Sequence, residues 1–133
     1  TAQDMEDNIN RAAGNYGLIY FYAKDCSYCE AQTPILKYFV EKYNWEIKPY
    51  DTGKDSKVAE AFNITITPTI LLIGRKNGEY LIVSSGVVSL PDMEERIYRG
   101  IRLLEGETSV ENYSTYDYQK GGVLDPRSIF TNK

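Results

Sequence analysis

The sequence predicts an α/β protein with a mixed central sheet and helices on both faces. Apolar segments of strand length alternate along the chain with segments of helical periodicity. A strand–helix–strand unit near the N-terminus is followed by two strands joined through Asn77-Gly78, a dipeptide typical of tight hairpins. The first unit predicts parallel strands and the hairpin predicts antiparallel ones, so the sheet is expected to be mixed.

The first half of the chain opens with an amphipathic helix over residues 2–14. The uninterrupted apolar run over 16–23 is typical of a strand buried on both faces. After Cys26, apolar residues recur at three- and four-residue spacing, which predicts a helix as far as Tyr43. Pro34 lies inside that helix and is expected to kink it, because proline cannot donate the backbone hydrogen bond.

Five elements and a tail are expected in the rest of the chain. The elements are a strand over 45–50, a short helix over 55–63, a strand over 67–74, an antiparallel edge strand over 79–86, and a helix capped by Ser89 that ends near Gly106. Residues 1–106 are therefore expected to form one domain. Residues 107–133 are polar and rich in tyrosine, and we expect an irregular tail that packs on the domain or on a partner.

Composition and charge exclude several classes of protein. The 133 residues carry a net charge of -4 and no basic run, which argues against nucleic acid as a partner because phosphate binding needs a basic surface. The apolar runs are far shorter than the roughly 20 residues of a membrane helix, so no membrane span is expected in this chain. There is no basic-then-apolar leader, and because the chain does not begin with Met, we expect that a targeting segment has been removed.

Cys26 and Cys29 are the only cysteines, and three roles compete for them. As a staple the pair would stabilise little, since the loop that it closes is very short. A zinc site needs four ligands, and with no histidine and no other cysteine an intrachain metal site is not expected. Two buried cysteines that act as small apolar side chains remain an alternative to a redox role.

The position of the pair, between a buried strand and a helix, favours the redox role. Cys26 is expected at the helix N-terminus, where free backbone N–H groups and the helix dipole stabilise a thiolate. Cys29 lies one turn inside the helix, shielded but within reach of a mixed disulfide on Cys26. This predicts Cys26 as the nucleophile and Cys29 as the resolving thiol. No metal or organic cofactor is needed, because the dithiol itself carries two electrons.

Around these cysteines the sequence resembles the thioredoxin superfamily, over about residues 5–104. The segment "LIYFYAKDCSYC" resembles the strand and active-site turn of that family, and Pro34 matches the proline of its active-site helix. The segment "NITITPTILLI" resembles the family's cis-proline loop, with Pro68 at the proline position, and "NGEYLIVSSG" resembles the hairpin that follows. The resemblance implies a thioredoxin-like fold and a cis Thr67–Pro68 bond in a loop that faces the cysteines. It also implies that the backbone of Thr67 pairs with the substrate. Without the resemblance, Pro68 would be read as a trans proline that begins a strand.

The sequence departs from thioredoxin at two places. Tyr20 lies six positions before Cys26, where thioredoxin has a buried acidic residue, which puts the aspartate-assisted proton transfer in doubt. Between the cysteines, Ser27 and Tyr28 replace the Gly-Pro of thioredoxin. Tyr28 together with Thr67 is more similar to bacterial periplasmic disulfide isomerases. Ser27 and Tyr28 are therefore expected to tune the redox properties of the pair.

The C-terminal "DPRSIFTNK" is similar to the end of the TraF/TrbB thioredoxin-like proteins of conjugative type IV secretion. This resemblance implies a periplasmic or otherwise extracytoplasmic disulfide isomerase or oxidase that assists pilus assembly. Its partners would be cysteine-containing protein substrates, a redox partner protein and secretion components. Two alternatives stay open: a scaffold of a secretion apparatus with a vestigial or regulatory cysteine pair, and a cytosolic reductase of the thioredoxin type.

Overall fold

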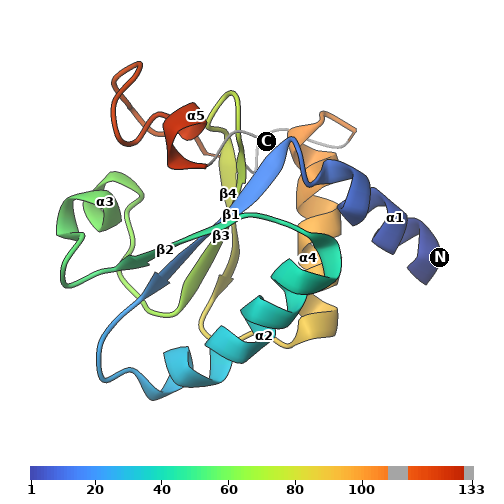
Figure 1. Ribbon diagram of the computed structural model, residues 1–133, viewed down its shortest axis with the longest axis horizontal. Helices are drawn as coiled ribbons and strands as arrows, with labels where there is room; N and C mark the ends of the chain where they lie inside the picture. The colour runs from blue at the N-terminus through green and yellow to red at the C-terminus, as the bar shows by residue number, and fades with distance from the viewer. Residues whose placement is uncertain (108–113, 131–133) are drawn as a thin grey trace.

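The computed structural model describes residues 1–107 and 114–130, and the rest of the predicted tail lies outside the described residues. The elements follow the predicted order, with one short helix added at the end (Figure 1). They are α1 (Ala2–Ala12), β1 (Tyr16–Tyr22), α2 (Ser27–Tyr43), β2 (Ile47–Asp51), α3 (Ser56–Ala61), β3 (Thr69–Gly74), β4 (Tyr80–Ser85), α4 (Leu90–Leu104) and α5 (Pro126–Ile129).

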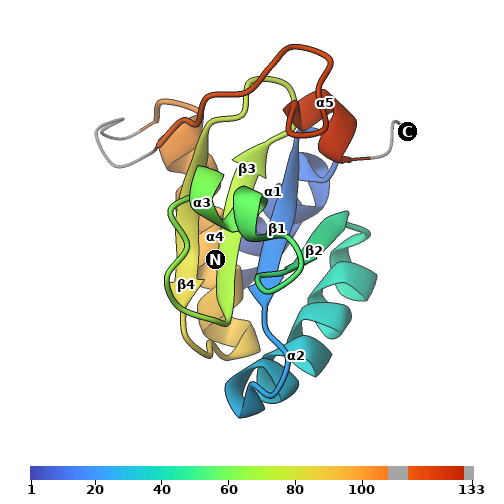
Figure 2. The same cartoon turned by 90° about the vertical axis from the view of Figure 1, so that its left-hand side faces the viewer.

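The four strands form one mixed sheet, as the sequence predicted, and the structure places them in the order β2-β1-β3-β4. β1 and β2 are parallel because α2 carries the chain back across the sheet between them. β3 runs antiparallel to β1 and to β4. The β3–β4 turn contains the predicted Asn77-Gly78, and Gly78 takes a φ of 73°, a conformation that glycine adopts without a steric penalty. Figure 2 shows the four strands side by side.

The first face of the sheet carries the larger core. Alternate side chains of β1 and β3, among them Leu18 and Leu72, point to this face and are fully buried. α1, α2 and α4 cover it together (Figure 1), and contribute Ile9, Phe39 and Ile97 to the same apolar cluster. Because α2 is anchored here along its length, its N-terminal end is held at the end of β1.

The second face is covered by α3 and by the C-terminal tail (Figure 2). Ser114 forms an antiparallel bridge with Tyr80, in which each backbone N–H donates to the other residue's carbonyl, at N–O distances of 2.8 and 2.7 Å. Tyr116 and Phe130 are buried in the apolar cluster of this face. The Phe130 ring lies against Gly17 of β1, where any larger residue would collide with it. The described part of the tail is thus packed on the domain.

The tail is not irregular throughout, because residues 126–129 form α5. Four residues are too few for apolar periodicity to indicate a helix. Asp125 holds this segment and is 1% exposed. Its carboxylate accepts hydrogen bonds from the guanidinium of Arg127 at 3.0 Å and from the backbone N–H groups of Gly121 and Arg127 at 2.8 and 2.9 Å. The hydrogen bonds from Arg127, the largest effect, together with that from Gly121, hold the pKa of Asp125 well below its ordinary value.

Replacing Asp125 with asparagine is expected to lower the midpoint temperature of thermal unfolding at neutral pH. That temperature should also fall less steeply in the variant than in the wild type as the pH becomes acidic. The pKa of Asp125 is depressed in the folded state, so its stabilisation is present above the unfolded-state pKa and is lost as the pH falls through the folded-state value. The difference in midpoint temperature between wild type and Asp125→Asn should be constant down to about pH 4 and should then shrink. Circular dichroism melts across this range measure it, with Asp117→Asn, at an exposed position of the same tail, as the control. A gap that persists unchanged into strong acid would contradict the expectation.

Candidate active site

Cys26 and Cys29 form a disulfide at the start of α2, with their Cα atoms 5.2 Å apart. The chain leaves β1 at Tyr22 and turns through Asp25, whose φ is 59°, before the helix begins. Cys26 is the N-cap residue of α2 and has extended backbone angles. It is partly exposed, whereas Cys29 is buried, as expected for a residue one turn inside the helix. An attacking sulfur from solvent would therefore meet Cys26 first.

The sulfur of Cys26 lies where backbone groups favour negative charge. The backbone N–H of Cys29 donates to Cys26 Sγ at 3.1 Å. The N–H of Glu30 donates to the carbonyl of Cys26 at 3.2 Å and closes the first turn of α2. When the disulfide opens, the Cys29 N–H and the positive end of the helix dipole would stabilise a thiolate on Cys26.

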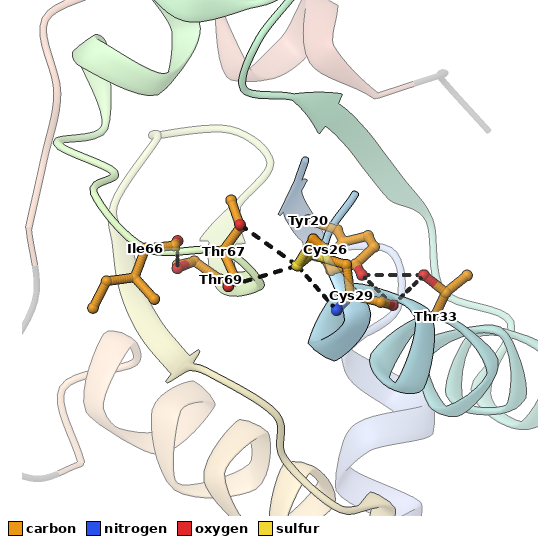
Figure 3. The surroundings of a disulfide bond; sticks show 7 residues. All are labelled: Tyr20, Cys26, Cys29, Thr33, Ile66, Thr67 and Thr69. Atoms are coloured by element: carbon orange, nitrogen blue, oxygen red, sulfur yellow. Dashed lines mark hydrogen bonds between the residues drawn. A yellow bond between two sulfur atoms is a disulfide. The ribbon is translucent and has the colours of Figure 1, made fainter. Parts of the chain in front are cut away.

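The loop before β3 faces the cysteine pair from the opposite side (Figure 3). The Thr67–Pro68 peptide bond is cis, which confirms the prediction made from the family resemblance. The Thr67 hydroxyl donates to Cys26 Sγ at 3.7 Å, and the Thr67 carbonyl oxygen lies 3.9 Å from the same sulfur. The disulfide sulfur has no proton, so the carbonyl contact is a van der Waals contact in this oxidised state. A Cys26 thiol could donate to that carbonyl.

Behind the pair, two hydroxyl groups hold the carbonyl of Cys29 (Figure 3). Tyr20 Oη lies 3.1 Å from Cys29 O, Thr33 Oγ1 lies 2.9 Å from it, and the two hydroxyl oxygens are 3.1 Å apart. The two hydroxyl groups have two protons between them, so at most two of these three contacts are hydrogen bonds at any time. Burial raises the pKa of Tyr20, which keeps its hydroxyl neutral. Tyr20 is therefore a hydrogen-bonding group at this position and not a base at neutral pH.

Three large apolar side chains are exposed on the segments that surround Cys26. Tyr28 stands between the cysteines and is 68% exposed, and Ile66, next to Thr67, is 54% exposed. Val87, in the loop between β4 and α4, is 44% exposed. The polar Ser27 beside Tyr28 is also exposed. Sequence reasoning identified Tyr28 but missed Ile66 and Val87, whose only signal is an apolar residue within a predicted loop.

The described residues carry neither a cluster of metal ligands nor a membrane-spanning helix. Across residues 1–107 and 114–130, no three His, Cys, Asp or Glu side chains converge as metal ligands would. No helix in those same ranges has the length and apolar character needed to cross a bilayer.

Comparisons with known proteins agree with this geometry. Residues 1–98 match the family model described as "TraF: F plasmid transfer operon protein". No curated protein sequence matches the chain. Among solved structures, the chain is similar to the thioredoxin of Fasciola hepatica, with 25% identity and a TM-score of 0.58, over 74% of this chain and 93% of that one. It is also similar to the reduced thioredoxin pre-protein of Schistosoma mansoni, with 28% identity and a TM-score of 0.53, over 73% and 90% of the two chains. The fold is thus the α/β thioredoxin-like fold that the sequence predicted.

Proposed function

This chain belongs to the TraF family of F plasmid transfer proteins, and from that premise we propose that it is a thiol–disulfide oxidoreductase, acting as an isomerase or an oxidase on extracytoplasmic proteins. Its place would be the periplasm, in the assembly of a conjugative pilus or type IV secretion apparatus. The observation that carries the proposal is the setting of Cys26: the residue is partly exposed, and its Sγ accepts a hydrogen bond from the N–H of Cys29 and lies against Thr67.

In the oxidising direction, a substrate thiolate attacks Cys26 Sγ. The Cys26–Cys29 bond breaks, its electron pair passes to the Cys29 sulfur, which takes a proton, and a mixed disulfide joins the substrate to Cys26. A second substrate thiolate then attacks the substrate sulfur of that mixed disulfide and releases Cys26 as a thiolate. Two electrons have moved from the substrate to the protein. A redox partner protein that carries a disulfide would reoxidise the pair.

In the isomerising direction, the reduced Cys26 thiolate attacks a substrate disulfide and releases one substrate thiolate. Another substrate thiolate then attacks the mixed disulfide, which forms a new substrate pairing with no net transfer of electrons. A stalled complex is resolved when Cys29 attacks the Cys26 sulfur, which leaves the substrate reduced and the pair oxidised. Ser27 and Tyr28 would bias the balance between these directions.

The surroundings of Cys26 favour extended, partly folded protein substrates. In this proposal the backbone of Thr67, held by Pro68, pairs with an extended substrate segment as a neighbouring strand would. The exposed Tyr28, Ile66 and Val87 would contact apolar residues that flank the substrate cysteine, since apolar surface gains free energy when it leaves water.

A trapping experiment tests the proposed chemistry. Reduced Cys29→Ser protein keeps the Cys26 thiol but cannot resolve a mixed disulfide, so it should accumulate covalent complexes with scrambled ribonuclease. Non-reducing electrophoresis would detect these complexes, and dithiothreitol should dissolve them. The Cys26→Ser/Cys29→Ser double variant is the matched control and should form none. If Cys29→Ser formed no complexes, or if Cys26→Ser alone formed as many, the assignment of Cys26 as the nucleophile would be wrong.

A further inference from the structure

Gln32 lies three residues after Cys29, and its side chain hydrogen-bonds to the loop between β4 and α4 rather than to either sulfur. We propose that Gln32 is a positioning residue, which holds the loop between β4 and α4, and through it the Thr67–Pro68 loop, in register with the cysteine pair. This inference rests on the proposed oxidoreductase function and deepens it, because it names a residue that governs docking of protein substrates.

The side chain of Gln32 is fully buried, with 0% exposure. Its amide nitrogen and its amide oxygen both form hydrogen bonds with the backbone of one residue, Val88. Its Nε2 group donates to the carbonyl of Val88 at 3.2 Å, and the N–H of Val88 donates to Gln32 Oε1 at 2.7 Å. The amide thus pairs with Val88 as a neighbouring strand would. A buried amide costs free energy unless both of its ends are bonded, so this pairing fixes how the loop lies against α2.

From Val88 the contacts continue to Cys26. Two residues before Val88, the N–H of Gly86 donates to the carbonyl of Pro68 at 2.7 Å. Pro68 follows Thr67, whose hydroxyl and carbonyl both contact Cys26 Sγ. The loop between β4 and α4 therefore hydrogen-bonds to the Thr67–Pro68 loop through Gly86 and to α2 through Val88.

These contacts form a ring around the site, in which two side-chain contacts join the two halves: that of Gln32 with Val88 and that of Thr67 with Cys26 Sγ. One half is the start of α2, which carries the cysteines. The other half is the pair of loops that carry Thr67, Ile66 and Val87, the groups proposed to meet the substrate. Gln32 and Val88 are 56 residues apart in the chain, so no covalent proximity would replace the link if it were lost.

Loss of Gln32 should therefore affect substrate docking and leave the sulfur chemistry in place. The N–H of Cys29 that faces Cys26 Sγ belongs to α2 itself and does not depend on the loops. A small thiol such as dithiothreitol needs only access to the Cys26 sulfur. A protein substrate also needs the loops at the correct distance from that sulfur, because small misplacements of reacting groups cost much of the rate.

The test compares these two kinds of reactant in Gln32→Leu, which keeps an apolar volume but neither hydrogen bond. We expect kcat/KM for oxidation of reduced, unfolded ribonuclease to fall roughly tenfold, mainly through KM, which corresponds to about 1.4 kcal/mol of lost docking free energy. The rate of reduction of the Cys26–Cys29 disulfide by dithiothreitol and the equilibrium constant of the pair with glutathione should each change by less than about twofold. Gln32→Glu, in the neutral acid form that a fully buried carboxyl adopts, keeps an acceptor for the Val88 N–H and a hydroxyl donor for the Val88 carbonyl. It should lie between wild type and Gln32→Leu, which also covers the case in which the leucine variant does not fold.

Tyr43→Phe is the matched control, because it removes a buried hydrogen bond, to Glu94, from the other end of the same helix. It should lower stability without changing the ratio of the two rates. Hydrogen exchange provides a readout that does not depend on activity, since the Val88 and Gly86 amides should exchange faster in Gln32→Leu and not in Tyr43→Phe. If Gln32→Leu lost as much rate with dithiothreitol as with ribonuclease, or if hydrogen exchange at Val88 were unchanged, the role of Gln32 would be overturned and the proposed function would stand. A wild-type protein with no activity on ribonuclease would overturn the proposed function and this role with it.

Discussion

Replacing Cys26 with serine is expected to abolish thiol–disulfide turnover, with a loss of roughly a thousandfold or more, as for removal of other nucleophiles. A serine hydroxyl cannot form the mixed disulfide, and Cys29 is buried and cannot take over the attack. Ribonuclease refolding and insulin reduction would measure the loss. The variant also lacks the disulfide, so its stability is compared with reduced wild type and reduced Cys29→Ser. Full activity in Cys26→Ser would eliminate the oxidoreductase reading.

The same chemistry separates the enzyme from the scaffold alternative. If the function of the chain depends on thiol–disulfide exchange by the cysteine pair, donor cells that carry the Cys26→Ser/Cys29→Ser double variant should transfer their plasmid poorly. If transfer stayed at the wild-type level, a binding role in the apparatus would outrank the chemistry. The tail does not by itself favour a scaffold, because its described residues Tyr116 and Phe130 are buried in this domain and are not free for docking.

Ending the chain after residue 106 is expected to prevent stable folding. The truncation removes Tyr116, Ile129 and Phe130, which are all buried against the second face of the sheet. Each such side chain contributes about 1.5–3 kcal/mol when buried, and a domain of ordinary stability has only about 5–15 kcal/mol in total. The truncation would also expose Phe21 and Ile73, which are fully buried in the complete chain. Expression in the soluble fraction and urea denaturation would measure the effect.

A point substitution in the tail is the milder form of this test. Phe130→Ala should lower the free energy of unfolding by about 3–5 kcal/mol, since it leaves a cavity above Gly17. Val123→Ala, at an exposed position of the same tail, is the matched control and should change it little. A chain ending at 106 that unfolds at the same urea concentration as the full chain would contradict the structural role of the tail.

Much of the fold was predictable because its signals are local. The apolar run over 16–23 became β1, and the periodic segment after Cys26 became α2, each within about two residues of the expected bounds. Asn77-Gly78 indicated the β3–β4 turn, because the positive φ of Gly78 strains most residues that carry a side chain. The cis Thr67–Pro68 bond came from the family resemblance rather than from any local pattern.

The parts that were not predicted depend on contacts between distant residues. α5 is too short for a periodic signal, and the burial of Phe130 depends on a gap above Gly17 on a strand far away in the sequence. Gln32 looks like any polar helical residue until Val88 is seen against it. Tyr20 differs from thioredoxin in the sequence, but its contact with Cys29 O is visible only in the structure.

The sequence by itself determined the order of the strands and helices and the place of the C-x-x-C pair at the start of a helix. Those features follow from side-chain periodicity and from spacing within one segment, which the chain carries before it folds. Only the tertiary structure decided that Tyr20 contacts the carbonyl of Cys29, and that Gln32 pairs with Val88 from 56 residues away. It also decided that the tail completes the second face. Such contacts form only when packing brings distant segments together, and a fully buried polar group reveals its role only through the partner that it bonds.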